Sequence, residues 1–552
     1  MKDIINSSFF LLAFFLITVH QISAQEPLNQ TLKALFESYY QESETAAVAI
    51  ISDNNKPVFE YYHGNADLEN KLKANSKTQF LIGSLTKQFT AAAILILEEQ
   101  ELLSTEDLIG DYLPLFKKED YPVRIHHLLT HTAGIPSDNA NKDIQQNIKG
   151  DLSPVERINF IKNENLLFTP GEQYDYSNNG YIMLGLIIEK VSGLSYADFL
   201  ELNIFRPNDM IHTQVMNHKK GKANQAIGYA LNHSDVLQKA PIHASTFSAG
   251  GIWSTPRDLN KWAIALFSHQ ILSKESLSKM LQNHTLINGK TLNVGYGWEM
   301  NTVSDLLSYE HSGAEPGYKC YSIFIPKKDI HILSCQNSEE GSPTEVSIKL
   351  AALVAGTPYP DERHEIQLSN DQTANFTGTY LFNKSQKRFI STNDKGLYIM
   401  APGGLKQPLM AIDDHTLIYS NGYRQLSFQN LTDAGYSEVQ YLNRIQSLNG
   451  VKTSNQLPVE SSTIELSLEV LRSYTGLYES EMFNMTISLI DGDLFAQPEG
   501  SDQLKLLAKA KNKFYIEEIG AEIEFDSIDG RTPKQIKILL EGQLMIGVRK
   551  ID

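Results

Sequence analysis

The first 355 residues show short alternating apolar and polar runs near their two ends and longer helical stretches between them. Residues 46–52 and 57–62 predict one β-hairpin, and residues 317–336 predict another. Between them, the run from Phe89 to Leu97 is apolar on almost every side, which is typical of a helix buried inside a domain. Because strands occur at the ends and helices in the middle, the pattern predicts an α+β domain and not alternating βα units.

Beyond residue 356 the pattern changes to short strands separated by Gly, Asn and Asp turns, and it repeats. Ile366–Ser369 recurs 98 residues later as Ile464–Ser467, and Phe376–Tyr380 recurs at the same offset as Tyr474–Tyr478. Later matches are 97 residues apart, so one single-residue gap relates the two copies. We therefore predict one all-β module used twice, a small antiparallel barrel or sandwich, in residues 364–452 and 464–552.

The first two dozen residues have the composition of a cleavable secretory signal. Phe9–Val19 is nearly all apolar, and Ile22-Ser23-Ala24 precedes Gln25 as a small-residue cleavage site. The apolar run is too short to cross a bilayer, and no later stretch approaches the length of a membrane-spanning helix. We expect residues 1–24 to be removed and the mature chain to be secreted or periplasmic, without an integral membrane segment.

The charge balance excludes two classes of partner. The chain has 65 Asp and Glu residues against 48 Lys and Arg residues, for a net charge of -17. Nucleic acids and anionic membranes both require basic surface, so neither is an expected partner.

The two cysteines, Cys320 and Cys335, are placed symmetrically about the turn Pro326–Asp329. In a hairpin centred on that turn they face each other across the two strands. A disulfide would form there in an oxidising compartment. Two packed free thiols are the alternative, because directly opposed strand positions strain the bridge. Either arrangement is structural, so neither cysteine is expected to be catalytic.

Ser84 and Lys87 stand one helical turn apart where Gly83 leads into the apolar helix, so their side chains share a face. A serine hydroxyl must lose its proton to a neighbouring base as it attacks a carbonyl. Lys87 can be that base if burial lowers its pKa well below the usual value of about 10.4. Backbone N–H groups at the start of a helix also favour developing negative charge at Ser84. On its own, this spacing also occurs by chance in long chains.

A second motif contains Tyr176 and Asn178, at the end of the segment Phe168–Asn178. The tyrosine can relay a proton if a nearby cation lowers its pKa from about 10, and the asparagine can hydrogen-bond a substrate amide. The alternative is structural: Tyr176 packs in the core, and Asn178 caps a helix that begins near Gly180. The motif by itself leaves both interpretations open.

A third motif, His311-Ser312-Gly313-Ala314, directly precedes the second hairpin and is therefore expected on a strand. A glycine on such a strand lets a substrate backbone approach closely, and the Ala314 N–H group can point into a site. A lone histidine on a strand is more often structural.

In order and spacing, the three motifs together resemble those of the serine β-lactamase and penicillin-binding protein superfamily, in its class C, D,D-peptidase and esterase branch. The resemblance covers roughly residues 30 to 355. It implies a β-lactamase-related domain over residues 25–355, an antiparallel sheet with a helical region, and the repeated modules look like accessory β-domains of some relatives. The flanking segments that are also similar are Phe80–Gly83, His127–Pro136, Tyr176–Tyr181 and Gly250–Leu259.

Carried over to this chain, the resemblance makes Ser84 the acylated nucleophile and Lys87 its proton acceptor. Tyr176 is expected to assist as a general base and to return a proton to the leaving group. One oxyanion-hole donor lowers the barrier by about 3 to 4 kcal/mol. The residues expected to bind the substrate are Asn178, His311 and Gly313, and those expected to supply oxyanion-hole N–H groups are Ser84 and Ala314.

One departure from the family pattern changes the expected substrate. Where class C β-lactamases carry a lysine in the third motif, this chain has His311, as certain D,D-peptidases and esterases do. Histidine is only partly charged near pH 7, so it attracts a substrate carboxylate less than lysine does. His127 and His131 are spaced like metal ligands, but no Glu follows His127 as the metalloprotease pattern requires. No metal or other cofactor is therefore expected.

The sequence thus predicts an exported serine hydrolase that acts through an acyl-enzyme on an amide or ester. A D-amino-acid peptide or a small ester is favoured over a β-lactam as the substrate, and the oligomeric state stays open. The alternative is an envelope protein whose hydrolase domain is vestigial and whose β-modules bind wall peptide or glycan.

Overall fold

The computed structural model describes residues 27–550 with short gaps, and the predicted signal, residues 1–24, lies outside the described residues. The chain divides into two compact units, Met1–Pro358 and Tyr359–Asp552. None of the described helices is both long and apolar enough to span a bilayer. The gaps are 117–121, 137–151, 163, 217–223, 232–236, 243–245, 384–385, 394–395, 403, 458–462, 481–483, 491, 499–502, 517–518, 527–531 and 541–542.

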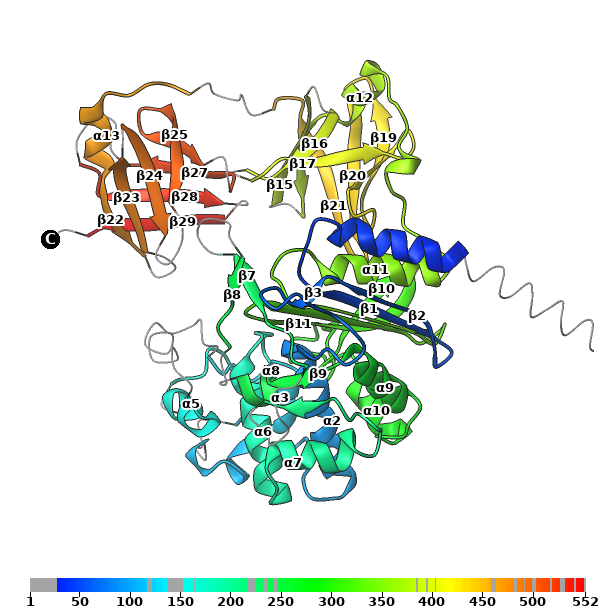
Figure 1. Ribbon diagram of the computed structural model, residues 1–552. Helices are drawn as coiled ribbons and strands as arrows, with labels where there is room; N and C mark the ends of the chain where they lie inside the picture. Colours follow the sequence, from blue (N-terminus) through cyan, green and yellow to red (C-terminus); the bar gives the residue numbers. More distant parts are fainter. Residues whose placement is uncertain are drawn as a thin grey trace, which may run out of the picture. The chain divides into compact units, whose positions relative to one another are not determined.

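An antiparallel sheet forms the centre of the first unit (Figure 1). In hydrogen-bonding order its strands are β10 (Glu299–Val303), β11 (Leu306–Glu315), β12 (Tyr318–Ile325), β13 (Ile330–Gln336), β1 (Ala47–Asp53) and β2 (Lys56–His63). Both predicted hairpins are confirmed, because β1 pairs with β2 and β12 pairs with β13. Since β13 also pairs with β1, the two ends of the unit meet in the middle of the sheet.

Helices lie on both faces of this sheet (Figure 1). On one face α11 (Pro343–Val354) packs against β12 and β13. On the other face is a larger helical region, which confirms the α+β prediction. Its helices are α2 (Thr86–Glu99), α3 (Ile125–Leu129), α5 (Pro154–Ile161), α6 (Asn178–Ser192), α7 (Tyr196–Leu200), α8 (Phe247–Gly250), α9 (Pro256–Phe267) and α10 (Lys274–Met280).

Short strands connect these layers. Strands β5, β9 and β6 form one small sheet, β3 pairs with β4, and β7 pairs with β8. Their bounds are β3 (Asn65–Asp67), β4 (Leu72–Lys73), β5 (Phe80–Leu81), β6 (Gln214–Val215), β7 (Tyr229–Leu231), β8 (Leu237–Lys239) and β9 (Ile252–Ser254).

Helix α2 is the buried helix that the apolar run predicts. Every residue from Thr86 to Leu97 is buried, and the helix packs against α6 and α8. A 3-10 turn, η1 (Gly83–Leu85), leads into it. Gly83 has a φ of +53°, which a glycine adopts without the steric cost that a Cβ would bring. Ser84 therefore lies in the turn that begins the central helix of the unit.

Strand β11 lies close against this turn because Gly313 has no side chain. A Cβ on Gly313 would collide with the carbonyl oxygen of Ile82, and a Cβ on Gly83 would lie 2.5 Å from the Ala314 nitrogen. From the sequence, Gly313 is expected to admit a substrate backbone. The structure differs, because the backbone that occupies the space beside this glycine belongs to the chain's own turn. The close contact places the Ala314 nitrogen next to Gly83, the residue before Ser84.

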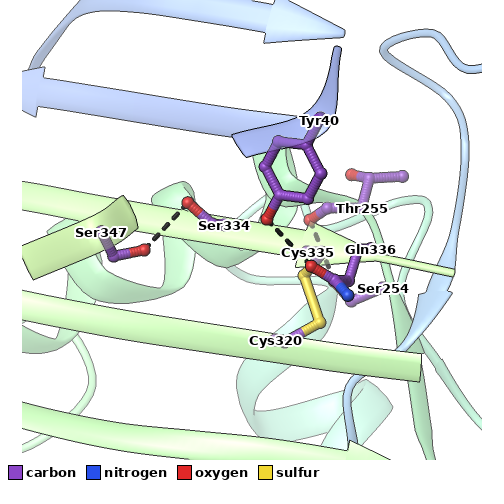
Figure 2. Close-up of a disulfide and its surroundings, with 8 residues drawn as sticks. All are labelled: Tyr40, Ser254, Thr255, Cys320, Ser334, Cys335, Gln336 and Ser347. Atoms are coloured by element: carbon purple, nitrogen blue, oxygen red, sulfur yellow. Dashed lines mark hydrogen bonds between the residues drawn. A yellow bond between two sulfur atoms is a disulfide. The ribbon is translucent and has the colours of Figure 1, made fainter. Parts of the chain in front are cut away.

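The two cysteines occupy opposed positions of the β12–β13 hairpin, as their symmetry about the turn predicts. Of the two alternatives, the structure has the disulfide between Cys320 and Cys335, which Figure 2 shows. Beside it, the Tyr40 hydroxyl donates to Gln336 Oε1 at 2.9 Å. The bridge therefore links two central strands in the interior of the unit, where both cysteines are buried.

The second unit contains the predicted module twice, each time as a closed antiparallel barrel. Strand β14 pairs with β21 to close the first barrel, and β22 pairs with β29 to close the second. The first barrel has β14 (Gly378–Phe382), β15 (Gln386–Asn393), β16 (Gly396–Met400), β17 (Gln407–Ala411), β18 (Thr416–Tyr419), β19 (Arg424–Thr432), β20 (Gly435–Asn443) and β21 (Gln446–Ser454). The second has β22 (Gly476–Glu479), β23 (Asn484–Ile490), β24 (Asp493–Pro498), β25 (Leu504–Ala510), β26 (Lys513–Ile516), β27 (Ala521–Phe525), β28 (Gln535–Leu540) and β29 (Gln543–Arg549).

The recurring segments start each barrel in the same way. A short helix precedes the first strand of both, α12 (Asn370–Phe376) and α13 (Leu468–Tyr474). The side chain of Ser369 caps α12, and that of Ser467 caps α13, by accepting a hydrogen bond from a backbone N–H group of the first turn. The segments that recur 98 residues apart are thus those that begin the short helix and the first strand of each barrel.

The contact between β11 and η1 makes a testable prediction about stability. Replacing Gly313 by Ala should reduce the free energy of unfolding by about 1–3 kcal/mol, since the new Cβ must push two backbone segments apart. Thermal or urea unfolding measures this loss. Gly180→Ala is the matched control, because a Cβ there meets its nearest atom at 3.6 Å and alanine favours helix. Equal stability of the two variants would contradict the prediction.

Candidate active site

The amine of Lys87 is enclosed in the first turn of α2, with none of the residue's surface exposed. Its Nζ lies 2.8 Å from each of three oxygens: Ser84 Oγ, Asn178 Oδ1 and the main-chain carbonyl oxygen of Ala249. Burial lowers the pKa of Lys87 from 10.5 to about 7, and the charge of Glu315 opposes part of this shift. The cause is the loss of water, which disfavours the ammonium form.

A neutral lysine satisfies all three contacts. Its amine has two N–H groups and one lone pair. The oxygens of Asn178 and Ala249 can only accept hydrogen bonds, so they take the two N–H groups. The lone pair then faces Ser84 Oγ, which has a proton to donate. In its free-base form Lys87 is therefore placed to receive the serine proton.

Tyr176 reaches the same serine from the segment before α6. Its hydroxyl donates to Ser84 Oγ at 2.9 Å. Burial raises the pKa of Tyr176, so the condition set above for a proton relay, a pKa lowered by a nearby cation, is not met in this structure. The reason is that the nearby lysine carries only part of a charge near pH 7, while loss of solvent disfavours the phenolate. Tyr176 is therefore a protonated phenol that donates to the serine.

Asn178 is the first residue of α6, and the residue before it, Ser177, occupies the cap position without a side-chain capping bond. The helix begins at Asn178 and not near Gly180, so the capping alternative for Asn178 is wrong. Its side-chain oxygen accepts a hydrogen bond from Lys87 instead. The second motif is thus joined to the first through the lysine.

His311 lies on β11 with 4% of its surface exposed. Its Nδ1 is 2.6 Å from the main-chain oxygen of Ser312. A carbonyl oxygen only accepts, so we infer that Nδ1 carries the proton and that Nε2 is an acceptor. Burial lowers the pKa of His311 to about 4, and Lys87 adds to the shift. The histidine is therefore uncharged at neutral pH, whereas the sequence predicts a partial charge. Its charge thus differs even more from that of the lysine that class C β-lactamases carry in the third motif.

The structure also brings His131 into the site, a residue that the sequence analysis treats as structural. Its ring stacks on Tyr176 with centroids 4.2 Å apart and an angle of 28° between planes. Its Nδ1 accepts a hydrogen bond from the Ser177 backbone N–H group at 3.1 Å. The segment His127–Pro136, one of those similar to the family, contained the signal for it. His131 fixes the orientation of the phenol ring.

Sequence reasoning missed a buried charged group near the lysine. Arg157 on α5 donates through Nε to Asn179 Oδ1 at 3.1 Å, and 4% of its surface is exposed. Glu315 ends β11, two residues after Gly313, and its charge acts on both Lys87 and Arg157. Neither residue is part of one of the three sequence motifs, so only the tertiary structure shows that they belong near the site.

A group of possible metal ligands occurs in the second unit. In the described part of the chain, Asp413, Asp414 and His415 of the first barrel bring possible ligand atoms within 4.8 Å of one another. Two of them are exposed, and His415 Nδ1 already lies 2.7 Å from Asp414 Oδ1. His127, considered above for its spacing, accepts a hydrogen bond from the Arg124 backbone N–H group at 3.1 Å. We assign none of these residues to the chemistry of Ser84.

The site has a serine at the start of a buried helix in an α+β domain. On one side of it a lysine can accept its proton, and on the other a tyrosine donates to it. This arrangement defines a serine hydrolase. Residues 32–357 match the Beta-lactamase family, and the chain belongs to that family. This match confirms the resemblance that the three motifs indicate.

Two curated proteins are similar to this chain in sequence. The chain is 28% identical over 410 residues to penicillin-binding protein 4* of Bacillus subtilis (strain 168), covering 68% of this chain and 88% of that protein. It is 29% identical to protein flp of Staphylococcus aureus (strain MRSA252), covering 56% of this chain and 64% of that protein, which is less than two thirds of its length.

Solved structures show the same fold. An octameric penicillin-binding protein homologue from Pyrococcus abyssi has a TM-score of 0.56 and 25% identity, covering 76% of this chain and 99% of that one. A D-amino acid amidase from Ochrobactrum anthropi SV3 has a TM-score of 0.54 and 21% identity, covering 60% and 99%. The similarity to the amidase shows a shared fold only.

Burial of Lys87 predicts a pH-dependent contribution to stability. Its pKa falls from 10.5 in the unfolded chain to about 7 in the folded one, so between these values the unfolded chain binds more protons. The free energy of unfolding of the wild type should therefore rise with pH in this window relative to Lys87→Met, by up to about 1.4 kcal/mol per pH unit.

Urea unfolding at pH 7, 8 and 9 measures this difference. Lys274→Met, on the exposed start of α10, is the control and should change stability equally at each pH. A difference between wild type and Lys87→Met that does not vary with pH would show that the buried lysine keeps its ordinary pKa.

Proposed function

We propose that this protein hydrolyses an amide or ester through an acyl-enzyme on Ser84, with a D-amino-acid peptide, its amide or a small ester favoured over a β-lactam. The observation that carries the proposal is the pair of contacts at the serine: the Tyr176 hydroxyl donates to Ser84 Oγ at 2.9 Å, and Ser84 Oγ lies 2.8 Å from Lys87 Nζ. When Lys87 is the free base, its lone pair can accept the serine proton, so that proton has a path to the lysine.

In the acylation step Ser84 Oγ attacks the carbonyl carbon, and its proton passes to the Lys87 lone pair. The N–H groups of Ser84 and Ala314 hold the negative charge that develops on the carbonyl oxygen. When the bond to the leaving group breaks, Tyr176 supplies the leaving group with a proton and becomes a phenolate beside the lysine ammonium. Lys87 Nζ lies 4.9 Å from the centre of the Tyr176 ring, which favours this charge separation.

In the deacylation step water attacks the ester, and the Tyr176 phenolate takes a proton from it as a general base. The bond between Ser84 Oγ and the acyl carbon then breaks, and the Lys87 ammonium returns a proton to the serine. One water is consumed, an acid and the leaving group are released, and the three side chains regain their starting protonation states. Tyr176 thus acts as an acid in the first half-reaction and as a base in the second.

The state of His311 supports a substrate without a carboxylate at that position. Because the ring is uncharged and Nδ1 is bonded to Ser312, the nitrogen left for a substrate is an acceptor. An acceptor pairs with an N–H or O–H group and repels a carboxylate. Peptides that end in an amide offer N–H groups, whereas β-lactam drugs and peptides with a free carboxyl end offer a carboxylate. Asn178 completes the proposed substrate-binding set.

We also propose that the protein is exported. A disulfide joins Cys320 and Cys335, and such bonds persist in oxidising compartments. The apolar leader at residues 1–24 supports the same conclusion. The acidic net charge of -17 supports a small-molecule or peptide partner over a nucleic acid.

Removal of the nucleophile tests the reaction. Wild type should form a covalent adduct with a fluorophosphonate probe and turn over at least one class among D-alanyl peptides, D-amino acid amides and short-chain esters. Ser84→Ala should form no adduct, and its rate should fall to the uncatalysed level. Mass spectrometry locates the adduct, and a chromogenic cephalosporin in the same screen measures lactam hydrolysis. Absence of any adduct on folded wild type would favour the vestigial alternative.

Replacement of the histidine tests substrate choice. Lys at position 311 offers a charged donor, so His311→Lys should raise kcat/KM for a D-alanyl peptide with a free carboxyl end relative to the same peptide as its amide. A change of about tenfold or more corresponds to about 1.4 kcal/mol. His311→Gln, which is uncharged, is the control and should leave the ratio near that of wild type. Equal ratios in all three proteins would contradict the proposed role of His311.

A further inference from the structure

Glu315 brings a carboxyl group to the Lys87 pocket from the strand that also carries His311. The two residues are separated by an even number of positions along β11, so they share one face of the strand. A carboxylate oxygen of Glu315 fills the space that a side chain on Gly250 would need. Gly250 follows Ala249, whose carbonyl oxygen accepts a hydrogen bond from Lys87. The carboxyl group therefore lies beside the backbone that holds the lysine.

Among the described titratable groups that surround Lys87, Glu315 is the acidic one. The others are two histidines, three tyrosines and an arginine: His131, His311, Tyr176, Tyr181, Tyr196 and Arg157. Burial lowers the pKa of both histidines and raises that of all three tyrosines, so these five are neutral near pH 7. Arg157 stays cationic, although burial lowers its pKa to about 10. At the far end of α2, Glu98 pairs with Lys279 at 2.8 Å, about three turns away.

The carboxyl group and the lysine act on each other. Burial raises the pKa of Glu315 to about 7, and the Thr246 side chain and the charges of Lys87 and Arg157 oppose the rise. Glu315 in turn opposes the fall in the pKa of Lys87. Interacting groups that titrate in the same range share their protons as a pair. A carboxylic acid beside a neutral lysine has the same net charge as a carboxylate beside an ammonium, so Lys87 can become a free base without loss of a proton from the site.

We propose that Glu315 is a positioning residue that sets the protonation state of Lys87 and, through it, the pH range in which Ser84 is activated. The inference rests on the proposed function of the Ser84 site. Glu315 acts through the lysine and touches no reacting atom. Its alternative role is to balance the buried charge of Arg157, which would leave the titration of Lys87 unchanged when Glu315 is replaced.

Glu315→Gln preserves the size of the side chain and removes its negative charge. Lys87 then loses the charge that favours its ammonium form, so it should be unprotonated at lower pH. We plot kcat/KM, and the rate at which a fluorophosphonate labels Ser84, against pH. The acid limb, the part of each profile where the value rises with pH, should move to lower pH. Glu315→Asp restores a carboxylate and should return the limb toward its wild-type position.

Glu275→Gln is the matched control, because it makes the same change in net charge at an exposed position on α10. Its profile should coincide with that of wild type. An acid limb that stays in place in folded Glu315→Gln, as judged by its thermal unfolding, overturns the proposal.

A second measurement observes the lysine itself and requires no turnover. Protein labelled with ¹³C at the lysine ε-carbons is titrated by NMR, with Lys87→Met used to assign the Lys87 signal. The midpoint for Lys87 should be lower in Glu315→Gln than in wild type, and an unchanged midpoint overturns the proposal. If Glu315→Gln does not fold, the Glu315 carboxyl carbon and the Lys87 ε-carbon are followed together in wild type. Linked two-step curves support the proposal, and independent single steps overturn it.

The two measurements separate this inference from the proposed function. If Ser84 forms no adduct with any probe but the Lys87 midpoint falls in Glu315→Gln, the proposed function fails and the link between the two residues stands. If wild type is active and the Lys87 midpoint does not move, the function stands and this inference fails.

Discussion

Lys87 carries an amine into the first turn of a helix that is buried on all sides, and the site is arranged around this burial. An ammonium without water is unfavourable, so the lysine either finds acceptors or loses its proton. Here both occur: Asn178 and Ala249 accept its two N–H groups, and the lone pair that remains faces Ser84. The three oxygens around the amine come from α6, α8 and the turn η1, so the packing of the helical region onto α2 is what removes water from the amine and lowers its pKa.

The second requirement is the close contact between β11 and the turn before α2. Glycines at positions 83 and 313 let two backbone segments touch where any side chain would separate them. The contact brings the nitrogen of Ala314 beside Gly83, the residue before Ser84, and His311 and Glu315 lie on one face of the same strand. In the proposed reaction the sheet thus supplies substrate contacts and a charge, while the helical region supplies the nucleophile and its base. The Cys320–Cys335 disulfide joins the next two strands of the same sheet, β12 and β13.

The barrels of the second unit show how a repeat preserves structure with little identity. In each copy a capped helix leads into the first strand, and a tyrosine of that strand donates to a carbonyl oxygen four residues earlier: Tyr380 to Phe376 and Tyr478 to Tyr474, both at 2.9 Å. Each barrel buries its own apolar cluster. Because helix cap, tyrosine and core alternation recur together, the repeat is visible in the sequence although most other positions differ.

Local pattern was enough to determine the buried helix α2, both hairpins of the sheet, the register that opposes Cys320 to Cys335, and the two repeated all-β modules, whereas barrel or sandwich stayed open. Each of these depends on residues close in sequence or on a repeat. The order and spacing of the three motifs likewise predicted that Ser84, Lys87 and Tyr176 belong to one active site. Only the tertiary structure decided the protonation of Tyr176, the bond of Asn178 to the lysine, the stacking of His131, and the positions of Arg157 and Glu315. The physical reason is that desolvation and electrostatic coupling depend on which groups surround a side chain in space, and those groups come from elements far apart in the chain.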